Sequence, residues 1–307
     1  MTTEDRAQVY WQQSARSFEL QSKEFSVLLK PNEPTMLSEG GMGWQTMGIV
    51  SRPREDGWDE VALAVYNMPA IWVYRVKVEN NFMRMSVHRT HAGVMHGSKS
   101  VRMFPNVRDD FGTNRMFTAN FFGDGLLYNR GDGQFFLSRP PSSGASKWEL
   151  QEQAFSIDTA EGIGSALFVQ QRQKLFTIQS PADVDAPWSL CEYDYFGGRR
   201  FADGKRSPIS PYRYGLVVDG SDIWTITDVR GTILVEEELR RLGKKRELVL
   251  PGIYRGDDLV VSGPIGNGLC FLQNGGAIVS TYGAEFPGEC GLGRPSTLSY
   301  LPPKFFR

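Results

Sequence analysis

The chain has 307 residues, 40% of them hydrophobic and 22% charged, and its 34 basic and 35 acidic side chains give a formal net charge of −1. This composition is that of a folded domain and excludes a disordered chain. A near-neutral charge without a basic run also argues against a nucleic-acid binder that works by counterion release.

The N-terminal stretch predicts a helix and not a targeting signal. Residues Thr3 to about Phe25 contain neither Gly nor Pro, and Thr3 is a suitable helix cap with acidic residues directly after it. Those acidic residues, and the lack of a long apolar core, argue against a secretory signal. We therefore expect residues 1–30 to form a helical or extended segment that packs on one domain of residues 31–307.

The cysteines and the hydropathy pattern favour a cytoplasmic protein. Cys191, Cys270 and Cys290 are odd in number and widely spaced, so neither a zinc knuckle nor a dithiol redox site is expected. Buried thiols are the preferred interpretation, and one disulfide between Cys270 and Cys290 is the alternative. The apolar stretches are too short to span a membrane. We expect no membrane partner and no nucleic-acid partner, and the oligomeric state stays open.

The rest of the chain has the pattern of short β-strands. Aromatic and β-branched segments alternate with turns rich in Gly and Asp, which allow the positive φ of tight hairpins. A second short helix is expected at Val235 to Leu242. The strands expected are Val61–Tyr66, Ile71–Val78, Arg115–Phe122, Leu126–Asn129, Gln134–Leu137, Ala166–Gln170, Leu175–Ile178, Gly215–Val218, Ile223–Thr227, Thr232–Val235, Leu269–Leu272 and Ala277–Thr281.

A weak internal repeat points to a particular all-β architecture. The segment Gln134 to Pro141, which leads to Trp148, resembles Lys174 to Pro181, which leads to Trp188. A period of about 40 residues with several short strands is typical of a propeller blade. The sequence therefore predicts an all-β fold, a β-propeller of five to seven short antiparallel blades with an N-terminal helical segment. A β-sandwich or barrel is the alternative.

All three histidines lie within nine residues, at His88, His91 and His96. In a regular strand, alternation would send the first two to opposite faces. Because imidazole titrates near neutral pH, these residues are candidate catalytic acids or bases. Ordinary surface or hydrogen-bonded histidines, and a metal site, are the alternatives. The spacing matches no known zinc motif, so no metal is predicted.

Two further groups are candidate substrate-binding residues. Arg108 and Asp109 are a polar pair that can hold a charged or polar substrate group, although this segment also fits a turn. The second group consists of aromatic residues that offer stacking surfaces, even though most aromatics must pack in the core. They are Trp72, Tyr74, Tyr193, Tyr195, Tyr212 and Trp224. Neither a phosphate loop nor a dinucleotide fingerprint occurs, so no cofactor is predicted.

Divergence between the two repeat copies favours one distinctive site. Glu149 of the first copy corresponds to Ser189 of the second, whereas a multivalent lectin needs the same ligand residues in each blade. We therefore predict a cofactor-independent enzyme of the lyase, isomerase or cyclase type, or a single-site binder, for a small organic molecule in a central pocket. Its chemistry would be acid-base or shape-driven: cyclisation, isomerisation, dehydration or hydrolysis. A multivalent sugar-binding lectin and a protein-interaction propeller are the alternatives.

Overall fold

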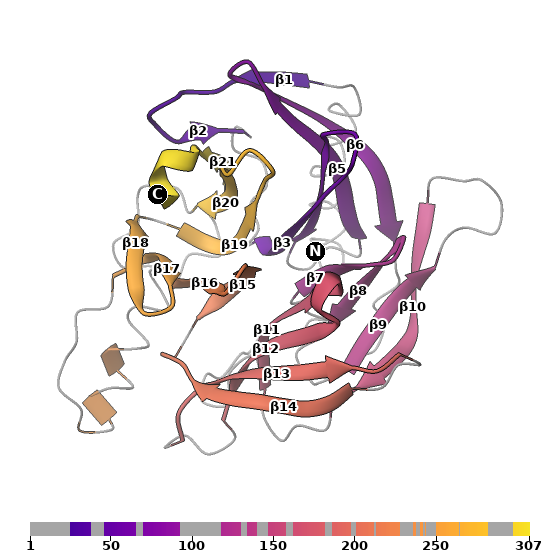
Figure 1. Ribbon diagram of the computed structural model, residues 1–307, viewed down its shortest axis with the longest axis vertical. Helices are drawn as coiled ribbons and strands as arrows, with labels where there is room; N and C mark the ends of the chain where they lie inside the picture. Colours follow the sequence, from indigo (N-terminus) through magenta and orange to yellow (C-terminus); the bar gives the residue numbers. More distant parts are fainter. Residues whose placement is uncertain are drawn as a thin grey trace, which may run out of the picture.

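The structure, a computed structural model, is a β-propeller of five four-stranded blades around a common axis (Figure 1). The prediction of a propeller is confirmed, and the number of blades is the lowest of the expected range. The structure describes residues 25–37, 46–65, 70–92, 118–129, 134–139, 147–157, 162–181, 186–197, 201–211, 213–227, 236–237, 240–241, 243, 250–263, 265–281 and 297–307.

Four blades are each formed by four consecutive strands. Blade I consists of β3 (Thr46–Pro53), β4 (Asp59–Val65), β5 (Ala70–Glu79) and β6 (Phe82–Ala92), and blade II of β7 (Thr118–Phe122), β8 (Gly125–Asn129), β9 (Gln134–Arg139) and β10 (Lys147–Ser156). Blade III consists of β11 (Gly162–Val169), β12 (Lys174–Ser180), β13 (Ser189–Tyr195) and β14 (Phe201–Pro208), and blade IV of β15 (Tyr214–Asp219), β16 (Asp222–Thr227), β17 (Gly252–Arg255) and β18 (Asp258–Ser262).

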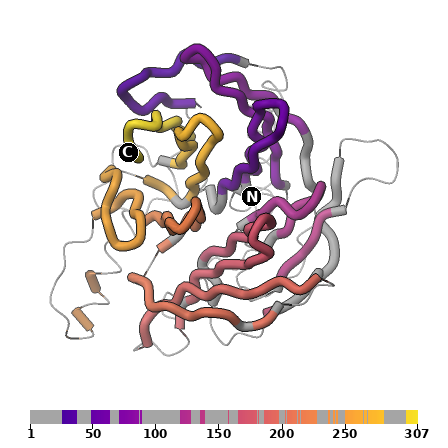
Figure 2. Tube along the Cα trace, in the orientation of Figure 1, coloured from indigo at the N-terminus to yellow at the C-terminus, as the bar shows by residue number. Residues whose placement is uncertain are grey.

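Blade V joins the two ends of the propeller. It consists of β19 (Ile265–Phe271), β20 (Ala277–Thr281), β21 (Thr297–Leu301) and the early strand β2 (Thr35–Met36). The register pairs Thr35 with Tyr300, and Leu37 donates a backbone hydrogen bond of 2.7 Å to the carbonyl of Leu298. Figure 2 shows the indigo N-terminal part beside the yellow C-terminal part. This pairing closes the ring of blades.

Two other pairings extend the sheets at their outer edges. Strand β1 (Phe25–Leu28) pairs antiparallel with β6 of blade I. Strand β10 of blade II pairs parallel with β6 over a short stretch, with Trp148 opposite His91. Two 3-10 turns complete the regular structure, η1 (Gln170–Arg172) after β11 and η2 (Pro303–Phe306) near the C-terminus. Blades I and II therefore form one continuous sheet.

Short turns with positive φ allow the strands to reverse. Asn80 and Asn81, at φ 51° and 62°, join β5 to β6, and Gly220, at φ 55°, joins β15 to β16. Side-chain amides tolerate this region better than other side chains, and glycine has no Cβ to clash. The Gly-rich and Asp-rich punctuation of the sequence therefore marks real hairpins. Every expected strand that falls within the described ranges overlaps an observed one.

Each strand alternates its side chains between two neighbouring blades. In β4, Val61 and Leu63 belong to the core cluster between blades I and V, whereas Ala62 belongs to the cluster between blades I and II. Three further clusters lie between blades II and III, III and IV, and IV and V. Because neither face of a blade is exposed to solvent, the hydrophobic core consists of five radial layers.

The expected helices and the sequence repeat differ from the structure or lie partly outside its described residues. The N-terminal helix lies outside the described residues except for Phe25, which begins strand β1. The internal repeat predicts the propeller correctly but matches strands that are not equivalent. It aligns β9, the third strand of blade II, with β12, the second strand of blade III. Of the second helix, residues 236–237 and 240–241 are helical, and the expected strand Thr232–Val235 lies outside the described residues. No helix in the described part of the chain is long and apolar enough to cross a membrane.

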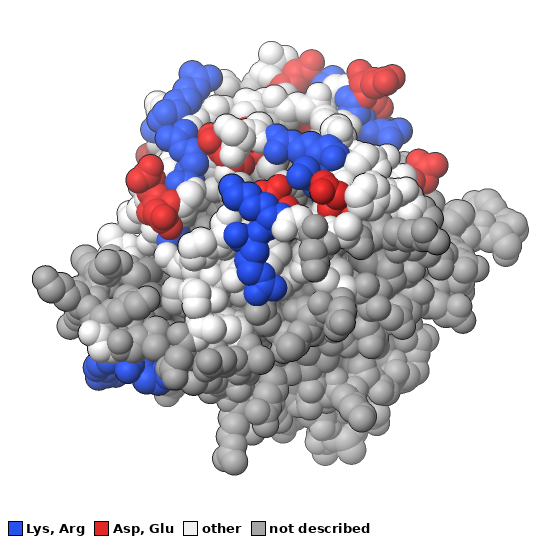
Figure 3. Space-filling view, turned by 60° about the horizontal axis from the view of Figure 1, so that its bottom comes forward, with Lys and Arg blue, Asp and Glu red and all other residues white. Residues whose placement is uncertain are grey.

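The surface charges are mixed. Figure 3 shows Lys and Arg side chains beside Asp and Glu side chains over the described part of one face. This agrees with the balanced composition.

Candidate functional site

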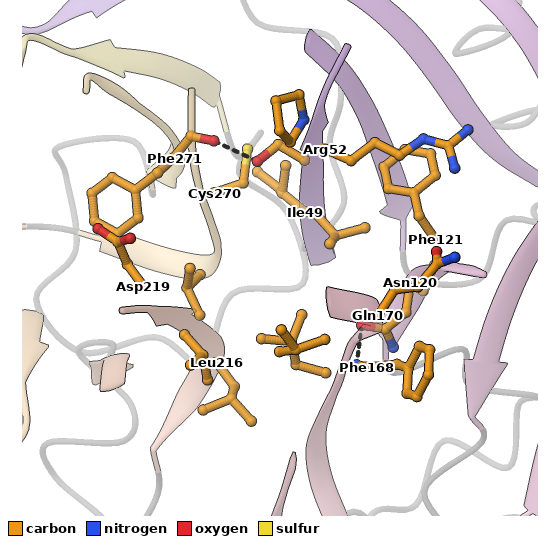
Figure 4. A pocket seen from close by; sticks show the side chains of 18 of the residues that line it. Ile49, Arg52, Asn120, Phe121, Phe168, Gln170, Leu216, Asp219, Cys270 and Phe271 are labelled. Atoms are coloured by element: carbon orange, nitrogen blue, oxygen red, sulfur yellow. Dashed lines mark hydrogen bonds between the residues drawn. The ribbon is translucent and has the colours of Figure 1, made fainter. Parts of the chain in front are cut away.

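The first strands of the five blades (β3, β7, β11, β15 and β19) surround a cavity of about 400 Å³ (Figure 4). Its apolar wall comes from all five blades and includes Ile49, Phe121, Phe168, Leu216 and Phe271. In four blades, polar side chains gather where the first strand turns into the second strand. They are Arg52, Asp59, Gln170, Gln171, Asp219 and Gln273.

Side chains of the first strands bind the backbone of the next blade around this cavity. Asn120, almost fully buried, donates from Nδ2 to the carbonyl of Ala166 (3.2 Å) and accepts from the amide of Phe168 at Oδ1 (3.1 Å). Ser51 donates to the carbonyl of Phe271, which links blades I and V. Buried hydrogen bonds of this kind fix the inner wall of the cavity, because an orphaned partner costs free energy.

The turns at one end of the cavity are also linked across blades. Arg52 donates from Nη1 to the carbonyl of Gly123, and Arg172 of blade III donates to the carbonyl of Gly220 of blade IV. Gln273 of blade V donates from Nε2 to the carbonyl of Trp58 (3.0 Å) in blade I. The polar end of the cavity is therefore held by side chains that reach from one blade to the next.

Arg52 is the cationic side chain of the cavity lining, and its charge is already paired. Its Nε lies 2.6 Å from Oε2 of the buried carboxylate of Glu60, and its guanidinium lies 4.4 Å from the centre of the Phe121 ring. The other oxygen of Glu60, Oε1, lies 3.6 Å from Nε2 of His88. Glu60 thus connects His88, on the outer strand of blade I, with Arg52 at the cavity.

Asp59 is the acidic side chain of the lining whose environment is unusual. Burial raises the pKa of its carboxyl, while the backbone amide of Gln273, which donates to Oδ2 at 3.1 Å, opposes that rise. A carboxyl with a raised pKa can hold or transfer a proton closer to neutral pH than an ordinary aspartic acid. Asp59 is therefore the acid-base candidate within the cavity.

Cys270 also lines the cavity, as a neutral thiol. Burial raises its pKa to about 12, so the thiolate that acts as a nucleophile is scarce at neutral pH. Cys191 and Cys270 are both buried and free of disulfides, as the preferred interpretation of the sequence expected. Cys290 lies outside the described residues.

Of the histidines predicted as catalytic, His88 has a described side chain, and it is not among the described residues that line the cavity. His88 is exposed on β6 and lies at an irregularity in the β5–β6 pairing. Its neighbours Val87 and Arg89 pair with the consecutive residues Tyr74 and Val73. His91 pairs with Ile71 near the end of the same strand. His96 lies outside the described residues. No group of metal-ligating side chains occurs among the residues that the structure describes.

The predicted aromatic residues that are described lie between blades and not in the cavity lining. Trp72 and Tyr74 pack between blades I and V, Tyr193 and Tyr195 between blades II and III, and Trp224 between blades IV and V. Tyr195 lies next to the cavity wall, since its ring centre is 5.5 Å from that of Phe168. Arg108, Asp109 and Tyr212 lie outside the described residues.

Sequence reasoning missed the residues that do line the cavity. Asn120 stands between two apolar residues of a strand, Asp219 directly precedes the hairpin glycine Gly220, and Gln273 lies two residues before Gly275. A polar residue within, or at the end of, the first strand of a blade was the available signal. The sequence repeat does not reveal this signal, because it matches the third strand of blade II with the second strand of blade III.

No protein-family model matches the chain, and no curated protein matches it. Among solved structures, it is similar to Myxococcus xanthus glutaminyl cyclase, with 9% identity over 90% of this chain and 96% of that chain and a TM-score of 0.44. It is also similar to an alpha-L-arabinofuranosidase from Lactobacillus brevis, with 8% identity, coverage of 83% and 90%, and a TM-score of 0.44. A GH43_1 enzyme from Xanthomonas citri has 12% identity, coverage of 88% and 91%, and a TM-score of 0.42.

Proposed function

We propose that the protein binds one small, uncharged polar organic molecule in the axial cavity and acts on it by acid-base chemistry. The observation that carries this proposal is the convergence of all five first strands on one cavity of about 400 Å³. Sites for small organic molecules typically measure about 300–1,000 Å³ and combine an apolar wall with a few polar groups. The lining described above has that composition.

The polar groups differ from blade to blade. Blade I contributes Arg52 and Asp59, blade III contributes Gln170, blade IV contributes Asp219 and blade V contributes Gln273. A ligand held by all of them meets different chemistry on each side, so it binds in one orientation. This supports a single-site binder or enzyme over a lectin with equivalent sites.

The charges of the lining disfavour an anionic ligand. The guanidinium of Arg52 is already engaged by Glu60 and by the carbonyl of Gly123, so it is not available to neutralise an anion. The side-chain amides and hydroxyls can donate to and accept from hydroxyl or amide groups of a ligand. We therefore infer a substrate that carries hydroxyl or amide groups.

Asp59 is the residue that we propose as the general acid. Its raised pKa favours the protonated carboxyl, which donates a proton to a leaving or rearranging oxygen and takes one back as the base. The histidine cluster stays the alternative source of protons, and Glu60 and Arg52 connect His88 with the cavity. Isomerisation, cyclisation, dehydration and hydrolysis all need such a group.

A thermal-shift screen with a library of uncharged hydroxyl- and amide-bearing metabolites tests the binding. The matched variants are Gln170→Trp, which places an indole in the cavity from an exposed position, and Lys205→Trp, which adds the same indole on exposed strand β14. We expect hits for the wild type and for Lys205→Trp that disappear in Gln170→Trp. Hits that Gln170→Trp retains would show that the ligand binds elsewhere.

Turnover of a hit distinguishes the two proton donors. Asp59→Asn keeps an oxygen for the amide of Gln273 but removes the proton, and we expect a loss of about 10²–10⁴-fold in kcat. His88→Ala serves as the comparison. Full turnover by a folded Asp59→Asn variant would refute the role of Asp59, and full turnover by a folded His88→Ala variant would remove His88 from the candidates.

A further inference from the structure

A second group of buried polar side chains lies in blade IV, away from the axial cavity. Arg213, directly before β15, is only 4% exposed, and its guanidinium carbon lies 3.6 Å from the centre of the Tyr254 ring. Thr225 and Thr227 of β16 are 1% and 0% exposed. None of these four residues is part of the axial cavity's lining.

The strand register brings these side chains together. Tyr254 of β17 pairs with Thr225 of β16, and Tyr214 pairs with Ile226, so that one step back along β15 places Arg213 opposite Thr227. Trp224 and Ile226, which alternate with the two threonines, pack toward blade V. Arg213, Thr225, Thr227 and Tyr254 therefore form one polar cluster in blade IV, which we call the Arg213 cluster.

Three polar atoms of the Arg213 cluster have no hydrogen-bond partner among the described residues. They are Nη1 of Arg213 and the Oγ1 atoms of Thr225 and Thr227. No ion pair with a described carboxylate engages Arg213 either, and burial lowers the pKa of its guanidinium while the charge of Asp257 acts in the opposite direction. A buried guanidinium without an anion, beside two buried hydroxyls without acceptors, leaves several costly groups unsatisfied.

We propose that the Arg213 cluster is a binding site for an oxyanion, with a carboxylate group as its ligand. A carboxylate accepts hydrogen bonds from the guanidinium and from both hydroxyls, so one small group satisfies all three orphaned atoms at once. The Tyr254 ring packs against the guanidinium, and the tyrosine hydroxyl is anchored by donating to the carbonyl of Leu250 at 2.6 Å. The cluster therefore holds its donors in place before the anion arrives.

The site is distinct from the proposed substrate site in place and in charge. The axial cavity has a paired cation and suits an uncharged molecule, whereas Arg213 forms no ion pair with a carboxylate of the described residues. Filling the cavity with Gln170→Trp should leave anion binding unchanged. The loss of one binding activity therefore does not imply the loss of the other, and the two proposals can be refuted separately.

The test is a titration of the full-length protein with sodium acetate, followed by thermal unfolding and calorimetry, against sodium chloride at the same ionic strength. Sodium phosphate is the second probe, which separates a carboxylate site from a phosphate site. We expect saturable stabilisation by acetate that exceeds any effect of chloride or phosphate. Equal effects of acetate and chloride, or saturable binding of phosphate alone, would overturn the proposal.

Variants connect the binding to the named atoms. Arg213→Met keeps an unbranched side chain over Tyr254, and we expect it to weaken acetate binding by about tenfold or more. Thr227→Val, which is nearly isosteric, should weaken it by about threefold. Arg255→Met is the control, because Arg255 is an exposed arginine of the same blade that packs over Trp224. Acetate binding that survives both Arg213→Met and Thr227→Val at wild-type strength would contradict the proposal.

Discussion

A single buried amide connects blades II and III at the wall of the cavity. Asn120 binds both the carbonyl of Ala166 and the amide of Phe168. We expect Asn120→Ala to lower the free energy of unfolding by about 2 kcal/mol or more, because both backbone groups lose their partner. Urea denaturation measures this, with Asn32→Ala, an exposed turn residue, as the control. An equal and small effect of both substitutions would show that water replaces the amide.

The buried carboxyl of Asp59 predicts a pH dependence of stability. Its pKa is raised in the folded protein above the ordinary value of 3.8, so the folded state holds a proton that the unfolded state releases in this window. The contribution of Asp59 to the free energy of unfolding is therefore greatest at low pH. It is lost as the pH rises through the pKa that the carboxyl has in the folded protein. Asp59→Asn should gain stability relative to wild type at about pH 7, and this gain should shrink at about pH 3.5.

Denaturation of both proteins at the two pH values measures that difference. Asp222→Asn, at an exposed hairpin position, is the control and should show no such pH-dependent gain. A gain for Asp59→Asn that is the same at both pH values would mean that burial does not raise the carboxyl pKa.

At the scale of single residues, the sequence predicts little of the site. The clustered histidines and the aromatic residues were chosen for their chemistry, yet Trp72, Tyr193 and Trp224 serve the packing between blades. Residue type cannot separate these roles, because an aromatic ring is as useful in a core as in a pocket. Which residues face the axis depends on which strand is the first of each blade.

Strand β17 shows how close the backbones of neighbouring strands approach within a blade. A Cβ added to Gly252 would lie 2.1 Å from the carbonyl oxygen of Val261 on β18. We expect Gly252→Ala to lower the free energy of unfolding by about 1–3 kcal/mol, because backbone cannot move aside easily. Gly256→Asn is the matched control, since that turn residue has φ +60° and open space, which asparagine tolerates. Similar losses for both substitutions would contradict this reading of Gly252.

At the scale of elements, strands of apolar and β-branched residues were predictable, with or without a glycine in the adjoining turn, as β5 and β12 show. The strands β7, β8 and β16 are rich in apolar residues and lie beside the hairpin glycines Gly123 or Gly220, and the sequence predicts each of them. Strand β6 escaped prediction, because its 11 residues include His88, Arg89 and His91, which have a loop-like composition. Its pairing with β5 over ten positions overrides that local preference.

Ring closure is a property of the whole molecule, and it depends on a strand of two residues. Leu37, directly after β2, is buried in the cluster between blades I and V, whereas its neighbour Met36 is exposed. We expect Leu37→Ala to lower the free energy of unfolding by about 2–4 kcal/mol, and Met36→Ala to change it by less than about 0.5 kcal/mol. Calorimetry measures both. Equal, small effects would mean that blade V does not need its fourth strand.

At the same scale, the fold class followed from the sequence and the blade boundaries did not. Short strands, Gly-rich turns and a weak repeat are enough to predict a propeller, because a four-stranded sheet with two apolar faces needs a neighbour on each side. The spacing between the first strands is uneven, since β3 begins at Thr46, β7 at Thr118 and β11 at Gly162. Long connections between strands therefore hide the period, and the closure by β2 involves residues from opposite ends of the chain.

The central claim is that the five blades create one ligand site on the axis. Native mass spectrometry of the protein with an uncharged metabolite from the screen tests it most directly, because it counts bound molecules on each chain. We predict a single bound molecule for the wild type and for Lys205→Trp, and none for Gln170→Trp. Several equivalent bound molecules, or one that Gln170→Trp still binds, would contradict the account.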